Sequence, residues 1–186
     1  ADLVLDLRRP LLWTFNPHTR AYLRLSRFQA VIYLCVDKIQ AQPGMPVELL
    51  DAAERDLCVA ANALFTTSPQ LFAALGPLNP GSYCFGNVAD ARHFGQALVT
   101  DLPRPSDWPQ SDGPVLIFIG AIDAYKLDFG LLEVLMQRTP QWTYLFIGPV
   151  GETDPSTDVS AWHRLANVHL LGTKNYNTLP AYLAHA

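Results

Sequence analysis

Short apolar runs recur along this chain, and each is followed by a stretch of amphipathic or turn-forming residues. The clearest run is residues 30–36 (AVIYLCV), whose β-branched and aromatic content favours a buried strand. Residues 47–61 follow it with a helical spacing of apolar side chains. Strands that alternate with helices in this way are typical of an α/β fold with a parallel sheet.

The same interpretation extends over the whole sequence. We expect strands at residues 11–15, 30–36, 63–67, 82–85, 115–119, 142–147 and 168–171. We expect helices at residues 18–27, 47–61, 129–138, 159–165 and 179–185, and a further helix that begins at Ser68 and Pro69 as N-cap and first helical residue. In helix 47–61 the inward face holds Leu49, Leu50, Ala53, Leu57 and Ala60, while Glu48, Asp51, Glu54 and Arg55 lie largely on other faces. Trp13 and Trp142 are predicted to be core residues.

Residues 101–114 hold a cluster of prolines, which marks them as a linker. The alternation of strands and helices restarts after it, so the sequence predicts two α/β units, 1–106 and 107–186. Ligands of open parallel sheets bind at the carboxyl ends of the strands. The residues at those ends are Asp37, Thr66 to Ser68, Asn87, Gly120 to Lys126, Gly148 to Gly151 and Gly172 to Lys174.

Composition excludes several classes of protein. Apolar residues make up 49% of the chain and charged residues 16%, which indicates a globular protein with a sizeable core. The net charge is −4 and Lys and Arg form no basic stripe, so nucleic acid is excluded as a partner. Cys35, Cys58 and Cys84 lie in apolar surroundings without a CxxC pair, which predicts buried, reduced thiols and no metal site.

The sequence contains no stretch of about 20 apolar residues. Its first residues also lack the small-residue cleavage site of a signal peptide. We therefore expect a cytoplasmic location, with peripheral contact to the inner face of a membrane left open.

Several residues have both a chemical and a structural interpretation. Lys126 suits a diphosphate because it follows Gly120 in a loop after a strand, but it also fits a solvated surface lysine. Gly148 and Gly151 allow backbone to approach a nucleotide, or simply form a turn. Asp37, like Asp123, could bind a sugar hydroxyl or act as a base, although capping of the following turn explains it as well. We interpret Asn87 as a structural turn residue.

Several segments of the chain resemble the GT-B glycosyltransferases of the family 4 (group 1) type. In the second half these are VLIFIGAIDAYKLDFGLL, WTYLFIGPVG and NVHLLGTKNYNTLPAYLA, which are similar to the first half of that family's nucleotide-binding domain. In the first half, YLCVDK, LLDAAERDLCVAANALFTTSPQL and FGNVADARHF resemble the end of its acceptor-side domain. The resemblance covers residues 11–184.

The resemblance implies sugar transfer from a nucleoside diphosphate sugar to a carbohydrate or lipid-linked acceptor, with retention and without a metal. The donor-binding residues it implies are Gly120, Asp123, Lys126, Gly148, Gly151, Thr173 and Lys174. The alternatives are a nucleotide-sugar epimerase on the same fold and a non-catalytic Rossmann-like binding module.

The chain also departs from the family pattern. Ala121 stands where the family often has Arg, and Val88-Ala89 stands where Gly-Val is common. The family's glutamate pair would follow Ala186, and its amino-terminal glycine-rich loop would precede residue 1. We therefore expect the chain to be a fragment that leaves the catalytic residues unknown and is itself inactive.

Overall fold

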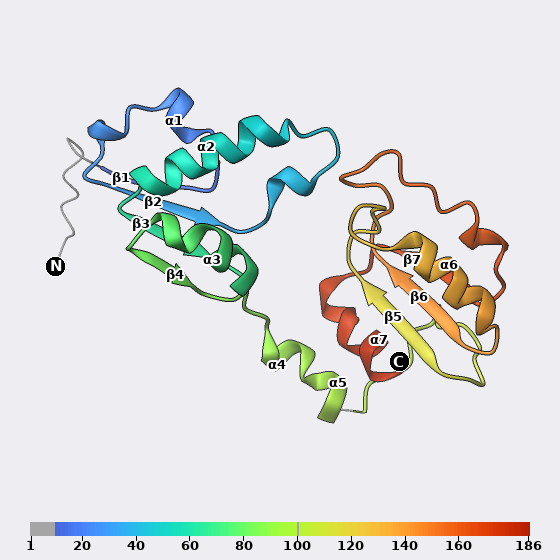
Figure 1. Cartoon of the computed structure of the whole chain (residues 1–186). Coiled ribbons are helices and arrows are strands. Elements are labelled where there is room, and N and C mark those ends of the chain that lie inside the picture. The colour runs from blue at the N-terminus through green and yellow to red at the C-terminus, as the bar shows by residue number, and fades with distance from the viewer. Residues whose placement is uncertain (1–9, 100) are drawn as a thin grey trace. The chain divides into compact units, whose positions relative to one another are not determined.

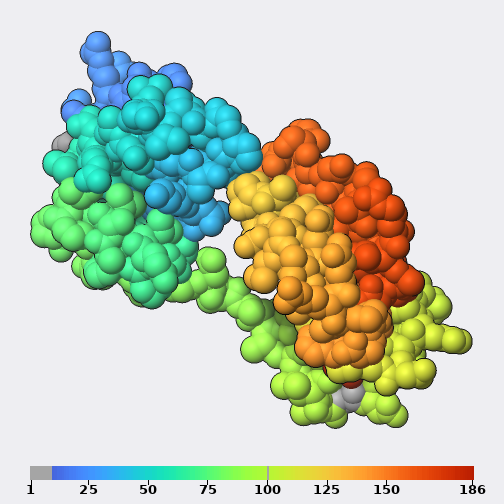
Figure 2. Space-filling model, turned by 45° about the vertical axis from the view of Figure 1, so that its right-hand side comes forward, coloured from blue at the N-terminus to red at the C-terminus, as the bar shows by residue number. Residues whose placement is uncertain are grey.

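A computed structural model of the chain describes residues 10–99 and 101–186. It confirms the predicted fold class, because it contains two separate, wholly parallel sheets with helices beside them (Figure 1). By its internal contacts the chain divides into two compact units between Val88 and Ala89. Figure 2 shows the surface of each unit, the first in blue to green and the second in light green to red.

The first unit is built on a four-stranded sheet in the order β1-β2-β3-β4. Its strands are β1 (Leu11–Thr14), β2 (Ala30–Cys35), β3 (Ala63–Thr66) and β4 (Ser82–Cys84). Its helices are α1 (Thr19–Tyr22), α2 (Val47–Ala60) and α3 (Pro69–Leu75), with 3-10 turns at Leu25–Arg27, Ile39–Ala41 and Gly76–Leu78. As predicted, Ser68 caps α3, its hydroxyl accepting from the N–H of Leu71 at 3.2 Å.

One face of the first sheet carries the core of this unit. Val31, Tyr33 and Cys35 are buried, while the residues between them are only half-buried, as the alternation of a strand requires. They pack with Leu57 and Cys58 of α2 and with Leu64 and Leu75. The four parallel strands follow one another in sequence order, and right-handed crossovers between such strands place the connecting helices on one face of the sheet. Helices therefore cover the other face of the first sheet less.

That less covered face explains one wrong prediction. Trp13 was expected in the core, but it is 53% exposed. Its ring lies 5.8 Å from that of Phe65, which in turn neighbours Tyr83 and Phe85 in an aromatic row across the sheet. Cys84, also expected to be buried, is exposed because β4 is a short edge strand.

The second unit is built on a three-stranded sheet in the order β5-β6-β7. Its strands are β5 (Val115–Ile119), β6 (Thr143–Ile147) and β7 (Val168–Gly172). Its helices are α4 (Ala91–Phe94), α5 (Gln96–Val99), α6 (Phe129–Arg138) and α7 (Leu179–Ala184), with 3-10 turns at Trp162–Arg164 and Tyr176–Thr178. Every residue of β6 is buried, and Figure 1 draws α6 and α7 on opposite sides of this sheet.

The core of the second unit lies between its sheet and α6. Tyr144 and Phe146 of β6 pack there with Met136 and the fully buried Trp162. Trp142, predicted to be a core residue, is partly buried against this cluster.

The proline-rich stretch 101–114 packs on α7 of the second unit. Asp107 accepts from the hydroxyl of Tyr182 at 2.6 Å, and the ring of Trp108 lies 6.3 Å from the Tyr182 ring. A ring nitrogen of His185 is also 2.9 Å from the carbonyl oxygen of Leu102. The domain boundary between residues 106 and 107 that the sequence predicts remains a prediction. The internal contacts of the structure group residues 89–106 with the second unit.

Two predicted helices are shorter than expected. The helix at 18–27 is interrupted because Leu23 and Arg24 have extended backbone, and Tyr22 at the end of its first part is 77% exposed. In place of the helix at 159–165 there is only the turn at Trp162–Arg164, preceded by an Asx turn in which Asp158 accepts from the N–H of Ser160.

The inward face of α2 also differs from the prediction. The buried residues are Leu50, Glu54, Leu57 and Cys58, whereas Leu49 is 60% exposed. A carboxylate therefore occupies a core position of the longest helix.

Candidate functional site

Three strand ends lie side by side at the carboxyl edge of the second sheet. The N–H of Gly120 donates to the carbonyl of Ile147 at 2.9 Å, and the N–H of Gly148 donates to that of Gly172 at 3.1 Å. Gly148 has φ +145°, and a Cβ at this position would lie 1.9 Å from the carbonyl oxygen of Gly120. Only glycine fits there, so the backbones of neighbouring strand ends can approach each other closely.

The two loops that leave this edge are joined to each other. Ile122, which is fully buried, pairs with Val150 as an isolated parallel bridge. Its N–H donates to the carbonyl of Pro149 at 2.8 Å, and its carbonyl accepts from Gly151 at 3.0 Å. Gly151 has a φ of +67°, a backbone conformation that residues with a side chain rarely adopt. The loops therefore extend the parallel pairing beyond the strands.

Asp123 and Lys126 brace these loops. One carboxylate oxygen of the fully buried Asp123 accepts from the N–H groups of Thr153 and Asp154, both at 3.2 Å. The other oxygen lies 3.1 Å from the ammonium nitrogen of Lys126. Desolvation disfavours the charge of Asp123, but Lys126 and the two N–H groups outweigh it and lower the pKa of Asp123. The carboxylate raises the pKa of Lys126 in return.

The lysine keeps bonding capacity despite this ion pair. An ammonium group has three donors, and Lys126 directs them to Asp123 and, at 3.5 Å, to the hydroxyl of Thr153. Its side chain is 39% exposed. Lys126 therefore holds the loop through Asp123 and still presents charge to solvent.

Thr173 and Lys174 follow β7 at the same edge of the sheet. Thr173 is exposed, while the ammonium of Lys174 forms a 2.6 Å ion pair with Asp107. The hydrogen bonds from Lys174 and Tyr182 lower the pKa of Asp107. All the sequence-predicted donor residues therefore lie after the ends of β5, β6 and β7, but Lys174 is already paired with the proline-rich stretch.

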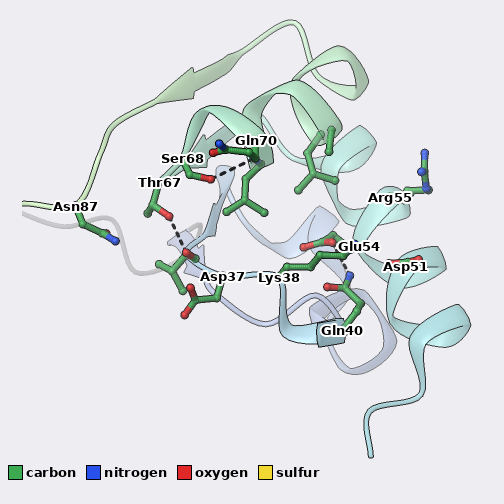
Figure 3. A pocket seen from close by; sticks show the side chains of 14 residues that line it. Asp37, Lys38, Gln40, Asp51, Glu54, Arg55, Thr67, Ser68, Gln70 and Asn87 are labelled. Carbon is green, nitrogen blue, oxygen red and sulfur yellow. Dashed lines mark hydrogen bonds between the residues drawn. The ribbon is translucent and has the colours of Figure 1, made fainter. Parts of the chain in front are cut away.

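The first unit has a cavity of about 520 Å³ at the corresponding carboxyl edge of its own sheet (Figure 3). Residues 36–38 line it after β2, Thr67 and Ser68 after β3, and Asn87 after β4. The side chains of α2 and α3 complete the wall. Asp37 and Asn87, which the sequence places after two different strands, thus line the same cavity.

One of the residues that line this cavity is a buried carboxylate. Glu54 is 6% exposed and accepts from the hydroxyl of Tyr33 at 2.5 Å, the thiol of Cys35 at 3.5 Å and the amide nitrogen of Gln40 at 2.7 Å. Burial, reinforced by Glu54, raises the pKa of Tyr33 far above its usual value and that of Cys35 to about 12. The pKa of Cys58 is raised to about 12 for the same reasons.

Glu54 and Gln40 were missed as site residues in the sequence. The signal for Glu54 was present, because it lies four residues after Leu50 and three before Leu57, on the inward stripe of the helix. Its charge led to the wrong assignment to the outer face. Gln40 sits in a proline- and glycine-rich loop and gave no signal that periodicity could detect.

Comparison with protein-family models and with curated proteins gives no match. Within residues 10–99 and 101–186, no three His, Cys, Asp or Glu side chains are grouped as metal ligands would be. In the same part of the chain, no helix has both the length and the apolar character needed to span a bilayer.

Proposed function

We propose that this protein is a glycosyltransferase of GT-B architecture, and that its second unit binds the nucleoside diphosphate of the sugar donor. The proposal joins the sequence resemblance to one observation. Three glycine-bearing strand ends lie side by side where open parallel sheets bind ligands, and a lysine-bearing loop leaves the first of them.

The physical case begins with the backbone at this edge. Gly148 and Gly151 adopt conformations that other residues avoid, and the missing Cβ of Gly148 lets its backbone pack directly on the carbonyl of Gly120. The bridge between Ile122 and Val150 keeps both loops in place before any ligand arrives. A site that is already formed loses little free energy to ordering when it binds.

Charge adds the second part of the case. A donor's diphosphate needs a cationic partner, and Lys126 can supply one N–H while Asp123 holds its ammonium group in position. Such a charge-assisted hydrogen bond contributes on the order of 1.5–3 kcal/mol. The resemblance implies sugar transfer without a metal, and in this proposal the side chain of Lys126 neutralises the diphosphate instead. The proposed acceptor is a carbohydrate or a lipid-linked sugar, reached from the cytoplasm or the inner face of a membrane.

Calorimetric titration with UDP and GDP tests the proposal. The chain should bind at least one of them, and Lys126→Ala should weaken that binding about ten-fold, since about 1.4 kcal/mol corresponds to a factor of ten. Lys38→Ala, which removes an exposed lysine of the first unit, is the matched control and should leave the affinity unchanged. Equal affinity in wild type and a folded Lys126→Ala variant would show that Lys126 only braces its loop.

A further inference from the structure

The face of the first sheet that points away from its core is apolar. In parallel strands, residues at matched positions of the register point to the same face. Ile32 and Leu34 alternate with the buried residues of β2, so they and their register partners on the other strands point outward. Phe85, just after β4, joins them because its ring lies 5.7 Å from that of Phe65. We call the resulting set the outer patch: Trp13, Ile32, Leu34, Phe65, Tyr83 and Phe85.

Much of the outer patch is open to solvent. Trp13 and Tyr83 are each 53% exposed, and Phe85 is 64% exposed. Leu11 and Phe15, two residues before and after Trp13, are 63% and 57% exposed. Because a large aromatic side chain buries about 150–250 Å² when it is covered, this region leaves on the order of 600 Å² of accessible surface. Monomeric proteins rarely expose larger apolar patches, and parallel sheets are almost always covered on both faces. The outer patch therefore has the character of an interaction surface.

The chemistry of the outer patch favours another apolar face as its partner. None of its six side chains carries a charge, so covering it removes no ion from water. For the same reason the patch has no cation of its own to attract an anionic membrane surface. The three neighbouring rings are inclined at 40–62° to the ring of Phe65, so the patch presents both ring faces and ring edges. Aromatic rings pair best edge to face or offset, and a surface that presents both can pair with a copy of itself.

The size of the outer patch suits a two-fold dimer, in which both copies use the same surface. A specific interface needs about 600 Å² or more from each partner. The patch with Leu11 and Phe15 supplies an area of this order before any polar rim is added. Two sheets can cover each other face to face, about 10 Å apart, with their side chains interdigitated.

We propose that the outer patch is a self-association surface, through which two copies of this chain pack sheet on sheet. The area lies at the lower end of the range for specific interfaces, so we expect a dissociation constant in the micromolar range. The proposal is independent of the nucleotide edge, because all residues of the patch belong to the first unit.

Sedimentation equilibrium of the whole chain tests this proposal. The wild type should change from monomer to dimer between about 1 μM and about 500 μM. Tyr83→Lys places an ammonium group in the patch and should weaken dimerisation about ten-fold or more, because the dimer would have to bury that charge. Val59→Lys, the matched control, adds the same charge at a 66% exposed residue of α2 and should leave the dimer unchanged. A wild type that stays monomeric over this range, or an equally strong dimer of folded Tyr83→Lys, would overturn the proposal.

Further measurements on the same samples keep the result decisive. If Tyr83→Lys does not fold, Phe85→Lys replaces it under the same criterion, since Phe85 lies beyond the end of β4. The indole N–H signal of Trp13 should shift with protein concentration, while that of the fully buried Trp162 should stay in place. Phosphatidylcholine vesicles represent the competing partner, and a chain that binds them while it remains monomeric would contradict self-association. UDP should bind Tyr83→Lys as tightly as the wild type, which keeps this proposal apart from that of the nucleotide edge.

Discussion

The two sheets present different chemistry at the same topological position. In the first unit the carboxyl edge is a cavity lined by side chains, and two buried side-chain oxygens among the described residues of this unit, those of Gln40 and Thr66, have no hydrogen-bond partner. In the second unit the edge is formed by backbone, with Gly148 packed against Gly120 and loops bridged beyond the strands. Similar topology thus presents side chains at one carboxyl edge and backbone at the other.

Each edge also contains a buried carboxylate, and the two are used differently. Glu54 accepts from neutral side chains, and it helps to raise the pKa of Tyr33 and Cys35. Asp123 accepts from two backbone N–H groups and pairs with Lys126, which lowers its own pKa. The first arrangement positions an amide, while the second fixes the path of two loops.

The largest effect should come from Gly148→Ala in the second unit. The new Cβ would meet the carbonyl oxygen of Gly120 at 1.9 Å, at a φ of +145° that alanine disfavours. We expect a loss of about 3 kcal/mol or more in the free energy of unfolding, measured by urea denaturation. Gly172→Ala is the control: its φ is +67° but no atom lies within 4 Å, so it should cost only about 1–2 kcal/mol. Equal costs would mean that the close contact between strand ends is unimportant.

Glu54→Ala should break the hydrogen-bond network around Glu54 in the first unit. Tyr33, Cys35 and Gln40 would lose their shared acceptor, at an expected cost of about 2–4 kcal/mol. The thiols report where the damage occurs. At pH 8 the exposed Cys84 of the wild type should react quickly with a disulfide reagent, while Cys35 and Cys58, each with its pKa raised to about 12, should react slowly.

In Glu54→Ala, Cys35 should become reactive as its surroundings loosen. Glu48→Ala, an exposed change in the first turn of the same helix, should leave both the stability and the slow thiols as they are. A Glu54→Ala variant with wild-type stability would remove the basis for treating Glu54 as a fixed anchor.

Asp123→Asn should change how the stability of the second unit depends on pH. The folded-state pKa of Asp123 is lowered, so its stabilisation is present above the unfolded-state value and is lost as pH falls through the folded-state value. Between about pH 5 and pH 2 the wild type should therefore lose more stability than the variant. Unfolding curves across this range provide the measurement, with Asp112→Asn, in the proline-rich stretch, as a control. Parallel pH profiles would show that the Lys126 pair contributes nothing.

Tyr182→Phe should have the smallest effect. It removes the hydroxyl that donates to Asp107 at 2.6 Å, but Asp107 keeps its ion pair with Lys174 and is partly exposed. The expected cost is about 1 kcal/mol or less, visible as a small shift of the denaturation midpoint. Tyr176→Phe, another tyrosine of this unit and half exposed, should be neutral. A much larger cost for Tyr182→Phe would mean that residues 101–114 depend on this single contact.

Periodicity in the sequence predicted the strands well, because a buried parallel strand needs an apolar run of limited length. All seven expected strands are present, with ends that differ by a residue or so. The failures have physical causes. Trp13 looks like a core residue, but which face of a sheet is covered depends on where the helices pack. The short helices α4 and α5 were missed because four residues carry too little periodic signal.

The positions of the candidate site residues were predictable only where backbone geometry defines them. Glycines after strands pointed to Gly120, Gly148 and Gly151, and the structure brings those strand ends together. The cavity around Gln40 and Glu54 depends on which polar groups are paired once the chain folds, and residue type alone does not report that. Lys174 illustrates the same limit, since its pairing with Asp107 joins residues far apart in sequence.

The central claim is that the carboxyl edge of the second sheet binds a nucleoside diphosphate, and backbone amide mapping during a titration with UDP and GDP tests it most directly. The account predicts saturable shifts at Gly120, Lys126, Gly148, Gly151 and Thr173, and an unchanged spectrum for residues 30–88. Shifts confined to residues 30–88, or no saturable shifts with either nucleotide, would contradict it.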